Sequence, residues 1–113
     1  MKLKQTEAQL QKACMEYMQY KNIPFIRNNT FAGTVMFGKK NTGYIHNNSF
    51  PGSPDILVFL PNGRTLHIEL KSATGKQSTE QKHYEEVLSK LGHEYHLVRE
   101  LEELEQHINN PIK

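Results

Sequence analysis

The chain of 113 residues has a single cysteine, Cys14. It can therefore form no internal disulfide and no thiolate metal cluster of its own. Cys14 falls on the apolar stripe of a predicted helix, where a small buried side chain is expected rather than a reactive thiol. This cysteine usage fits a reducing intracellular compartment, and we expect a cytoplasmic protein.

Long apolar runs are also missing. No stretch approaches the roughly 20 residues of a membrane span, and the lysine-rich start is not followed by the apolar segment of a signal peptide. The sequence has neither a glycine-rich phosphate loop of the Walker type nor a nucleophile elbow. We therefore expect no membrane partner and neither of those two kinds of active site.

Excess charge of one sign is absent as well. The formal net charge is +2, and the isoelectric point is near 8.7. A mildly basic chain permits nucleic-acid binding without demonstrating it. The length suits one domain, residues 1–113, with a core sufficient for stability.

Two short runs, 56–60 and 65–71, show the alternation of β-strands, whose successive side chains point to opposite faces of the sheet. In both runs the apolar side chains occupy even positions: Ile56, Val58, Leu60, Leu66, Ile68 and Leu70. Asp55, Glu69 and Lys71 are at odd positions. One face of the predicted sheet is thus apolar, and the other carries two carboxylates and an ammonium.

The link 61–64 between the runs predicts a hairpin, with Gly63 supplying a positive φ. A two-residue turn at Asn62 and Gly63 would pair residues whose numbers have an odd sum, which places the two apolar sets on opposite faces. We therefore predict an even-sum register, with a loop of three or five residues or a bulge at Gly63. In that register Asp55 lies opposite Glu69 or Lys71, within reach of a shared ion.

Two carboxylates held together repel unless a cation lies between them. Mg²⁺ or Mn²⁺ is the expected ion because both prefer oxygen ligands. Such an ion, with Lys71 beside Glu69, suits hydrolysis of a phosphodiester. Taken alone, Glu69 and Lys71 are equally consistent with a surface ion pair.

The remaining pattern predicts an α/β fold, with helices before and after the hairpin. Thr6 and Gln9 form a capping box at the start of a helix over about 6–21. Short strands are predicted at 25–27, 34–37 and 44–46, before the hairpin. A second helix over about 78–91, a strand at 95–98 and an amphipathic helix over 101–108 follow the hairpin.

With these motifs in place, the chain resembles the VRR-NUC domain of the PD-(D/E)xK, or restriction-endonuclease-like, nuclease superfamily. The resemblance covers nearly the whole chain. It implies a restriction-endonuclease-like α/β fold, in which helices flank a mixed central sheet in the order roughly α-β-β-β-α-β-α. It depends on Glu7 in the leading helix, on Gly52-Ser53-Pro54-Asp55, on Glu69-Leu70-Lys71, and on Gly75 followed by Ser78-Thr79-Glu80-Gln81. The last segment indicates the subfamily, because the other motifs are shared by restriction enzymes, repair nucleases and resolvases.

The resemblance implies the roles of the site residues. Asp55 and Glu69 are metal ligands, Leu70 contributes its backbone carbonyl oxygen, Lys71 is catalytic, and Gln81 supports the site. Glu7 corresponds to an early acidic residue and is a further candidate ligand.

Local physics offers a plain alternative for two of these residues. Glu7 suits the positive N-terminus of its helix. Gln81 forms a capping box with Ser78, so its amide can simply close the start of the second helix.

Four lysines are candidate contacts to nucleic-acid phosphates: Lys39, Lys40, Lys76 and Lys82. A solvated turn explains Lys39 and Lys40 equally well. Large side chains in the same stretch are candidates for a dimer surface: Phe31, Met36, Phe37 and Tyr44. His67 shares the odd face with Glu69 and is expected to be an ordinary exposed strand histidine.

The predicted function is metal-dependent, structure-selective cleavage of DNA. Stand-alone VRR-NUC proteins resemble junction-resolving nucleases, which implies a homodimer acting on a four-way (Holliday) junction in DNA repair. One alternative is a less selective nuclease for flaps, ends or single strands. Others are a catalytically silent nucleic-acid-binding module and a structural assembly subunit.

Overall fold

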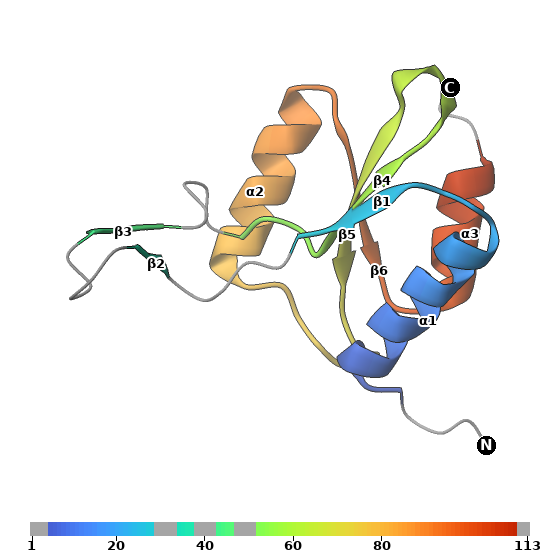
Figure 1. Ribbon diagram of the computed structural model, residues 1–113, viewed down its shortest axis with the longest axis horizontal. Helices are drawn as coiled ribbons and strands as arrows, with labels where there is room; N and C mark the ends of the chain where they lie inside the picture. The colour runs from blue at the N-terminus through green and yellow to red at the C-terminus, as the bar shows by residue number, and fades with distance from the viewer. Residues whose placement is uncertain (1–4, 29–33, 38–42, 47–51, 111–113) are drawn as a thin grey trace.

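The computed structural model describes residues 5–28, 34–37, 43–46 and 52–110. Its helices are α1 (Glu7–Tyr20), α2 (Thr79–Lys90) and α3 (Leu101–Asn109), with a short 3₁₀ turn at Pro61–Gly63. Its strands are β1 (Phe25–Arg27), β2 (Thr34–Phe37), β3 (Gly43–His46), β4 (Ile56–Phe59), β5 (Thr65–Leu70) and β6 (Glu94–Val98). Figure 1 shows these elements along the chain.

The central sheet has four strands in the order β1-β4-β5-β6. β1 and β4 are antiparallel, as are β4 and β5, whereas β5 and β6 are parallel. The sheet is therefore mixed. Its strands, taken in chain order together with α1, α2 and α3, follow the predicted order α-β-β-β-α-β-α. β2 and β3 pair antiparallel with each other in a separate two-stranded sheet.

The β4–β5 hairpin has the predicted even-sum register. Ile56 pairs with Ile68, and Phe59 pairs with Thr65, which leaves a five-residue loop between the last paired residues. The 3₁₀ turn lies in this loop, with Asn62 at φ 65° and Gly63 at φ 75°. Continued by one residue, the register places Asp55 opposite Glu69 at the start of β4 and the end of β5.

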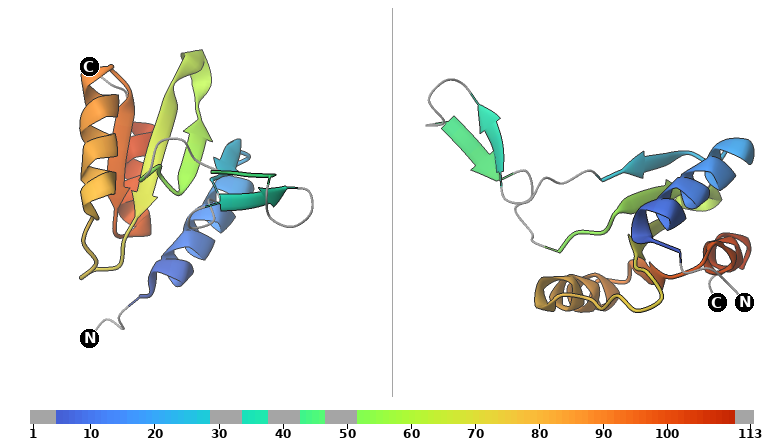
Figure 2. Two further views of the ribbon diagram at one scale, coloured as in Figure 1. Left: turned by 90° about the vertical axis from the view of Figure 1, so that its left-hand side faces the viewer. Right: turned by 90° about the horizontal axis from the view of Figure 1, so that it is seen from below.

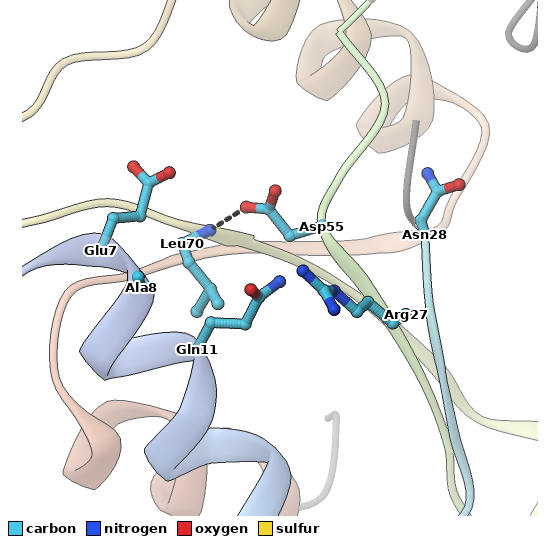
Figure 3. A pocket seen from close by; sticks show the side chains of 7 residues that line it. All are labelled: Glu7, Ala8, Gln11, Arg27, Asn28, Asp55 and Leu70. Carbon is cyan, nitrogen blue, oxygen red and sulfur yellow. Dashed lines mark hydrogen bonds between the residues drawn. The ribbon is translucent and has the colours of Figure 1, made fainter. Parts of the chain in front are cut away.

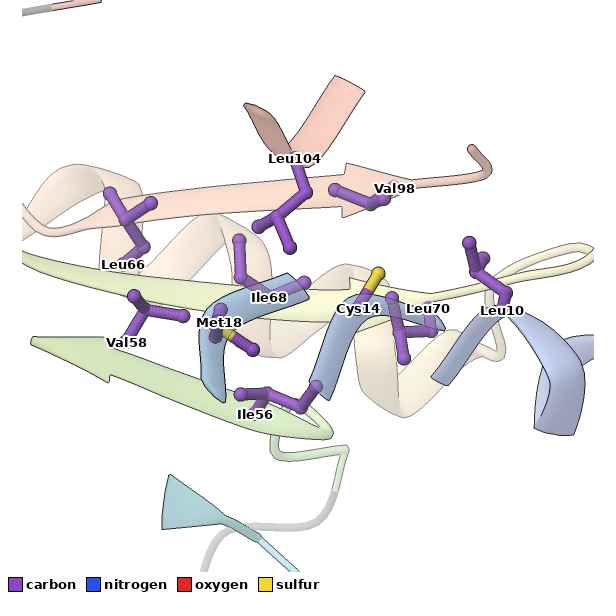
Figure 4. Packing of buried hydrophobic residues seen from close by; sticks show 10 residues of the cluster. All are labelled: Leu10, Cys14, Met18, Ile56, Val58, Leu66, Ile68, Leu70, Val98 and Leu104. Atoms are coloured by element: carbon purple, nitrogen blue, oxygen red, sulfur yellow. The ribbon is translucent and has the colours of Figure 1, made fainter. Parts of the chain in front are cut away.

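The even face of the hairpin forms the core. Leu66, Ile68 and Leu70 are fully buried with their neighbours on β4, and they pack against α1 and α3 (Figure 4). Cys14 is part of this cluster, and burial raises the pKa of its thiol to about 12, as expected for a structural cysteine.

The molecule has three layers, with α2 on one face of the sheet and α1 and α3 on the other (Figures 1 and 2). The odd face of the sheet is therefore partly covered by α2 and is not a simple solvated surface. Tyr95 on this face is 8 % exposed, and its neighbours in the layer include Tyr84 of α2. This arrangement buries one side of the predicted site.

Two arginines fix the ends of the sheet by hydrogen bonds. Arg64 in the hairpin loop binds the Glu94 carboxylate through Nε at 2.7 Å, and it donates to the carbonyls of His107 and Ile108 at the end of α3. Arg99 donates to the carbonyls of Ser72 at 2.6 Å and Gly75 at 2.8 Å. The loop between β5 and α2 is thereby anchored to β6.

The part of the chain that the structure describes contains no helix both long enough and apolar enough to cross a membrane.

Candidate active site

Asp55 and the end of β5 are joined by hydrogen bonds. The Asp55 N–H donates to the carbonyl of Ile68 at 2.9 Å, and the Leu70 N–H donates to Asp55 Oδ2 at 2.8 Å. The second of these bonds is drawn in Figure 3. The Asp55 carboxylate is thus held beside the backbone of the Glu69–Lys71 segment, as the register requires.

Glu69 is the buried charged residue of the site, with 2 % of its surface exposed. Its Oε2 accepts a hydrogen bond from Gln81 Nε2 at 2.6 Å and lies 3.8 Å from Lys71 Nζ. Its Oε1 is buried and has no hydrogen-bond partner in the described part of the chain. A carboxylate oxygen in this position costs free energy unless a cation or a proton compensates it.

The acidity of Glu69 reflects this environment. Burial, and then the negative charge of Asp55, raise the pKa of Glu69 to about 8, although the Lys71 ammonium acts in the opposite direction. The charge of Glu7 adds a smaller upward contribution to the same pKa. A carboxyl group with this pKa binds a proton near neutral pH unless another cation replaces it.

Gln81 closes the capping box of α2 and also contacts Glu69. Its Oε1 accepts from the Ser78 N–H at 2.8 Å, which completes the capping box of α2. Its Nε2 donates to Glu69 at the same time. Because one amide offers both an acceptor and donors, helix capping and contact with Glu69 do not compete.

The first turn of α2 reaches Glu69 because Gly52 packs directly against it. Gly52 has a φ of 89°, and a Cβ built on it would lie 2.4 Å from the carbonyl oxygen of Glu80 and 2.7 Å from the Gln81 nitrogen. Only glycine fits so close an approach of two backbones. Sequence reasoning had placed Gly52 in the motif without finding this packing role.

Asn28 is a site residue that sequence reasoning missed. Its Nδ2 donates to Ser53 Oγ at 3.0 Å and to the Pro54 carbonyl at 2.8 Å, and its N–H donates to the Asp55 carbonyl at 2.7 Å. It therefore ties the end of β1 to the segment that carries Asp55. Its place directly after a strand was the available signal, but an asparagine there also suits an ordinary turn.

Glu7 is exposed in the first turn of α1, yet it lines a cavity of about 240 Å³ together with Asp55 and Leu70. Figure 3 shows the Glu7 and Asp55 carboxylates on one side of this cavity, with Arg27 and Gln11 on the other. Among the described residues, no three histidine, cysteine, aspartate or glutamate side chains form a metal-binding cluster. Glu7 is therefore near Asp55 without completing a three-carboxylate site.

The lysines differ in their positions. Lys71 is largely buried beside Glu69, with 15 % of its side chain exposed. Lys76 is exposed in the loop before α2, and Lys82 is exposed in the first turn of α2. Lys39 and Lys40 lie outside the described residues, as does Phe31 of the suggested dimer surface, and the side chains of the other three residues of that surface are not described either.

His67 differs from the expectation of an ordinary exposed histidine. It is half-buried on the odd face, its Nδ1 has no hydrogen-bond partner among the described residues, and its ring meets that of His93 edge-on with centroids 5.6 Å apart. Burial, and then the nearby His93, lower the pKa of His67. The cause is the α2 layer on this face, which the strand pattern did not reveal.

The residues at this end of the sheet fit a hard divalent cation. The buried unpartnered Oε1 of Glu69 and the neighbouring Asp55 carboxylate supply oxygen ligands with excess negative charge. Asp55, Glu69 and the backbone carbonyl of Leu70 would hold the ion. The chemistry of these donors suits Mg²⁺ or Mn²⁺ better than zinc, which favours nitrogen and sulfur ligands.

A solved structure described as a VRR_NUC domain aligns with 96 % of this chain and 100 % of its own, with a TM-score of 0.64 and 19 % sequence identity. This chain has the VRR-NUC fold. The restriction-endonuclease-like order predicted from the VRR-NUC resemblance is thereby confirmed. The chain matches no protein-family model and no curated protein sequence.

Proposed function

We propose that this domain is a nuclease that hydrolyses phosphodiester bonds of DNA with the help of Mg²⁺ or Mn²⁺. The buried Glu69 carries the proposal, because its Oε1 lacks a partner while Asp55 adds a second carboxylate at the same end of the sheet. A buried carboxylate beside a second, half-buried one raises the free energy of the metal-free protein. A cation at this position relieves that cost, and the VRR-NUC fold supports the same assignment.

The proposed roles are those that the VRR-NUC resemblance implies, and the contacts of Glu69 support them. Asp55, Glu69 and the Leu70 carbonyl hold the ion, which supplies activation of a water molecule and neutralises charge on the phosphate oxygens. Lys71, whose Nζ is 3.8 Å from Glu69, stabilises the negative charge that develops on the phosphate. Gln81 orients Glu69 through its 2.6 Å hydrogen bond, and Glu7 is a further candidate ligand.

For the substrate we propose branched DNA, and specifically the four-way junction, cut by a homodimer. One small domain offers little surface for reading base sequence, which suits recognition of DNA shape and backbone. A symmetric dimer places two sites on two strands. The exposed Lys76 and Lys82 flank the start of α2 and are proposed phosphate contacts, together with Lys39 and Lys40.

A less selective nuclease for flaps, ends or single strands is the competing enzyme function. A catalytically silent binding module would not require a buried carboxylate beside Asp55 and Lys71, and this observation favours an enzyme.

The test is cleavage of labelled four-way junction, flap, single-stranded and linear duplex DNA with Mg²⁺ or Mn²⁺. We expect Lys71→Ala and Asp55→Asn to lower the rate by about 100-fold or more. The asparagine keeps an acceptor for the Leu70 N–H, so the fold should survive. Lys90→Ala, at the far end of α2, is the matched control and should cut as the wild type does.

Unchanged cleavage by both site variants would exclude this mechanism. Equal cutting of all four substrates would remove junction selectivity and leave a general nuclease. Tight DNA binding without any metal-dependent product would support the binding module. Light scattering of the protein alone and on the junction tests the dimer, which would be abandoned if the active species were a monomer in both.

A further inference from the structure

We propose that Arg27 and Gln11 bind a phosphate of the DNA strand next to the bond that is cut. Their binding site is the cavity between α1 and the end of β1. The inference depends on the proposed nuclease function, since Asp55 forms part of the same cavity wall. It adds a contact on the opposite side of the site from Lys76 and Lys82.

The position of Arg27 follows from strand register. Arg27 pairs with Ile56, whose side chain belongs to the core face that α1 covers. The guanidinium therefore extends on the α1 side of the sheet, where it approaches Gln11 (Figure 3). The next residue is fixed to the site by the 2.7 Å hydrogen bond from the Asn28 N–H to the Asp55 carbonyl.

Arg27 differs from the other two arginines of the chain. Arg64 is bound to Glu94, and Arg99 is bound to backbone carbonyls of the 72–75 loop. The Arg27 side chain is exposed, and its guanidinium makes no hydrogen bond or ion pair to another described residue. Its five N–H donors remain available for a ligand.

The cavity suits a phosphate in size and in donors. Its volume of about 240 Å³ is several times the ~30 Å³ that a water molecule occupies in the liquid. A guanidinium binds two phosphate oxygens with a pair of parallel hydrogen bonds, and the Gln11 amide adds neutral donors. The Asn28 amide is already engaged by Ser53 and Pro54 and is not counted among these donors.

The carboxylates of Glu7 and Asp55 on the same wall would repel an anion if they were alone. A divalent ion, if held by Asp55 and Glu69, would offset most of that repulsion, and Arg27 would then bind the phosphate beside it. We therefore expect the contribution of Arg27 to DNA affinity to be larger with a divalent ion present than without one.

The experiment measures binding of fluorescently labelled four-way junction and duplex DNA by anisotropy at several salt concentrations, with Ca²⁺ replacing Mg²⁺ and again in EDTA. Loss of one phosphate contact lowers the slope of log K against log salt by about 0.9 on duplex DNA. We expect this change for Arg27→Ala in Ca²⁺, with an affinity about tenfold lower. Lys90→Ala removes one positive charge from the far end of α2 and should leave the slope unchanged.

Two further variants separate a phosphate contact from a loss of structure. Arg27→Lys should keep the salt slope but bind several-fold more weakly, because the ammonium lacks the paired donors. Gln11→Ala, a neutral change, should weaken binding without changing the slope. If Arg27→Lys and Gln11→Ala both bind as the wild type does, the proposal is overturned, even if Arg27→Ala fails to fold.

Neutral methylphosphonates placed singly along the DNA locate the contact. One such substitution should weaken binding by the wild type and have no further effect on Arg27→Ala. Suppose that the wild type cleaves no DNA and still shows the methylphosphonate effect that Arg27→Ala lacks. That result would exclude the nuclease function and support the phosphate site. If the wild type cleaves DNA while Arg27→Ala keeps its salt slope and its kcat/KM, the phosphate site is wrong and the nuclease remains.

Discussion

The two carboxylate oxygens of Glu69 differ in their hydrogen bonds. Oε2 is held by Gln81 at 2.6 Å, whereas the buried Oε1 has no partner among the described residues. Because Glu69 is buried, a proton or a cation must compensate the charge of its carboxylate. The proposed metal ion and a proton would therefore compete for the same carboxylate, and pH should affect the stability of the metal-free protein strongly.

The first prediction concerns Glu69→Gln in the metal-free protein. The pKa of Glu69 is raised from 4.5 to about 8, so its contribution to stability is complete below pH 4.5 and decreases as the pH rises toward 8 and through it. This group lowers the free energy of unfolding by at most about 1.4 kcal/mol per pH unit in that window. The glutamine variant should lack this slope. Urea unfolding in EDTA between pH 5 and 8 measures this pH dependence of the free energy of unfolding. The same pH dependence in the wild type and in Glu69→Gln would contradict the raised pKa of Glu69.

The second prediction separates the two roles of Gln81. Ser78→Ala removes half of the capping box of α2 and should cost about 1 kcal/mol of stability with little change in metal affinity. Gln81→Ala removes the other half of the capping box and also the hydrogen bond to Glu69, so it should in addition weaken Mn²⁺ binding by roughly 10- to 100-fold. Calorimetric titration with Mn²⁺ decides between the roles. Equal metal affinity in the two variants would leave Gln81 a capping residue only.

At the scale of elements, the site depends on how closely the Gly52–Asp55 segment approaches α2. The backbone of Gly52 lies against Glu80 and Gln81, so the helix start and the Asp55 segment form one packed unit. Asn28 fixes this unit to β1 by hydrogen bonds to Ser53, Pro54 and Asp55. Displacement of α2 should therefore disturb the site even though none of its ligands changes.

The third prediction tests this packing with two glycines of similar φ. Gly52→Ala places a Cβ at 2.4 Å from the Glu80 carbonyl, so the start of α2 must move, and we expect a loss of about 2–4 kcal/mol together with weaker metal binding. Gly63 has a φ of 75° and nothing within 4 Å of its Cβ position, so Gly63→Ala should cost about 1 kcal/mol and leave the site unchanged. Urea unfolding and Mn²⁺ titration measure both effects. Similar losses for the two variants would contradict the packing argument.

At the scale of the whole molecule, metal binding should be coupled to folding, because the proposed ligands lie just before β4 and at the end of β5, which only the folded sheet brings together. The fourth prediction is that Mg²⁺ or Mn²⁺ stabilises the wild type by about 2.7 kcal/mol at 100 times the dissociation constant. Asp55→Ala should show no such stabilisation. Glu86→Ala, which removes an exposed carboxylate of α2, should respond as the wild type does. Thermal unfolding at increasing metal concentration is the measurement, and a midpoint that does not change with metal would exclude the ion site.

The sequence by itself determined the faces of the sheet. The even positions of the runs 56–60 and 65–71 are apolar, and that parity required an even-sum register with Asp55 opposite Glu69 or Lys71. The observed pairing of Ile56 with Ile68 selects Glu69. It also determined the capping boxes of α1 and α2 and the buried state of Cys14. These features are local, because strand alternation and helix capping depend on residues only a few positions apart.

Only the tertiary structure decided the environment of the site. The α2 layer covers the odd face, which buries Glu69, raises its pKa and half-buries His67. The close approach of Gly52 to Glu80, and the cavity that joins Arg27 to Asp55, connect segments that are tens of residues apart. Hydrophobic periodicity gives the face of each element but not its neighbours across layers, so burial and electrostatics at this site follow from packing alone.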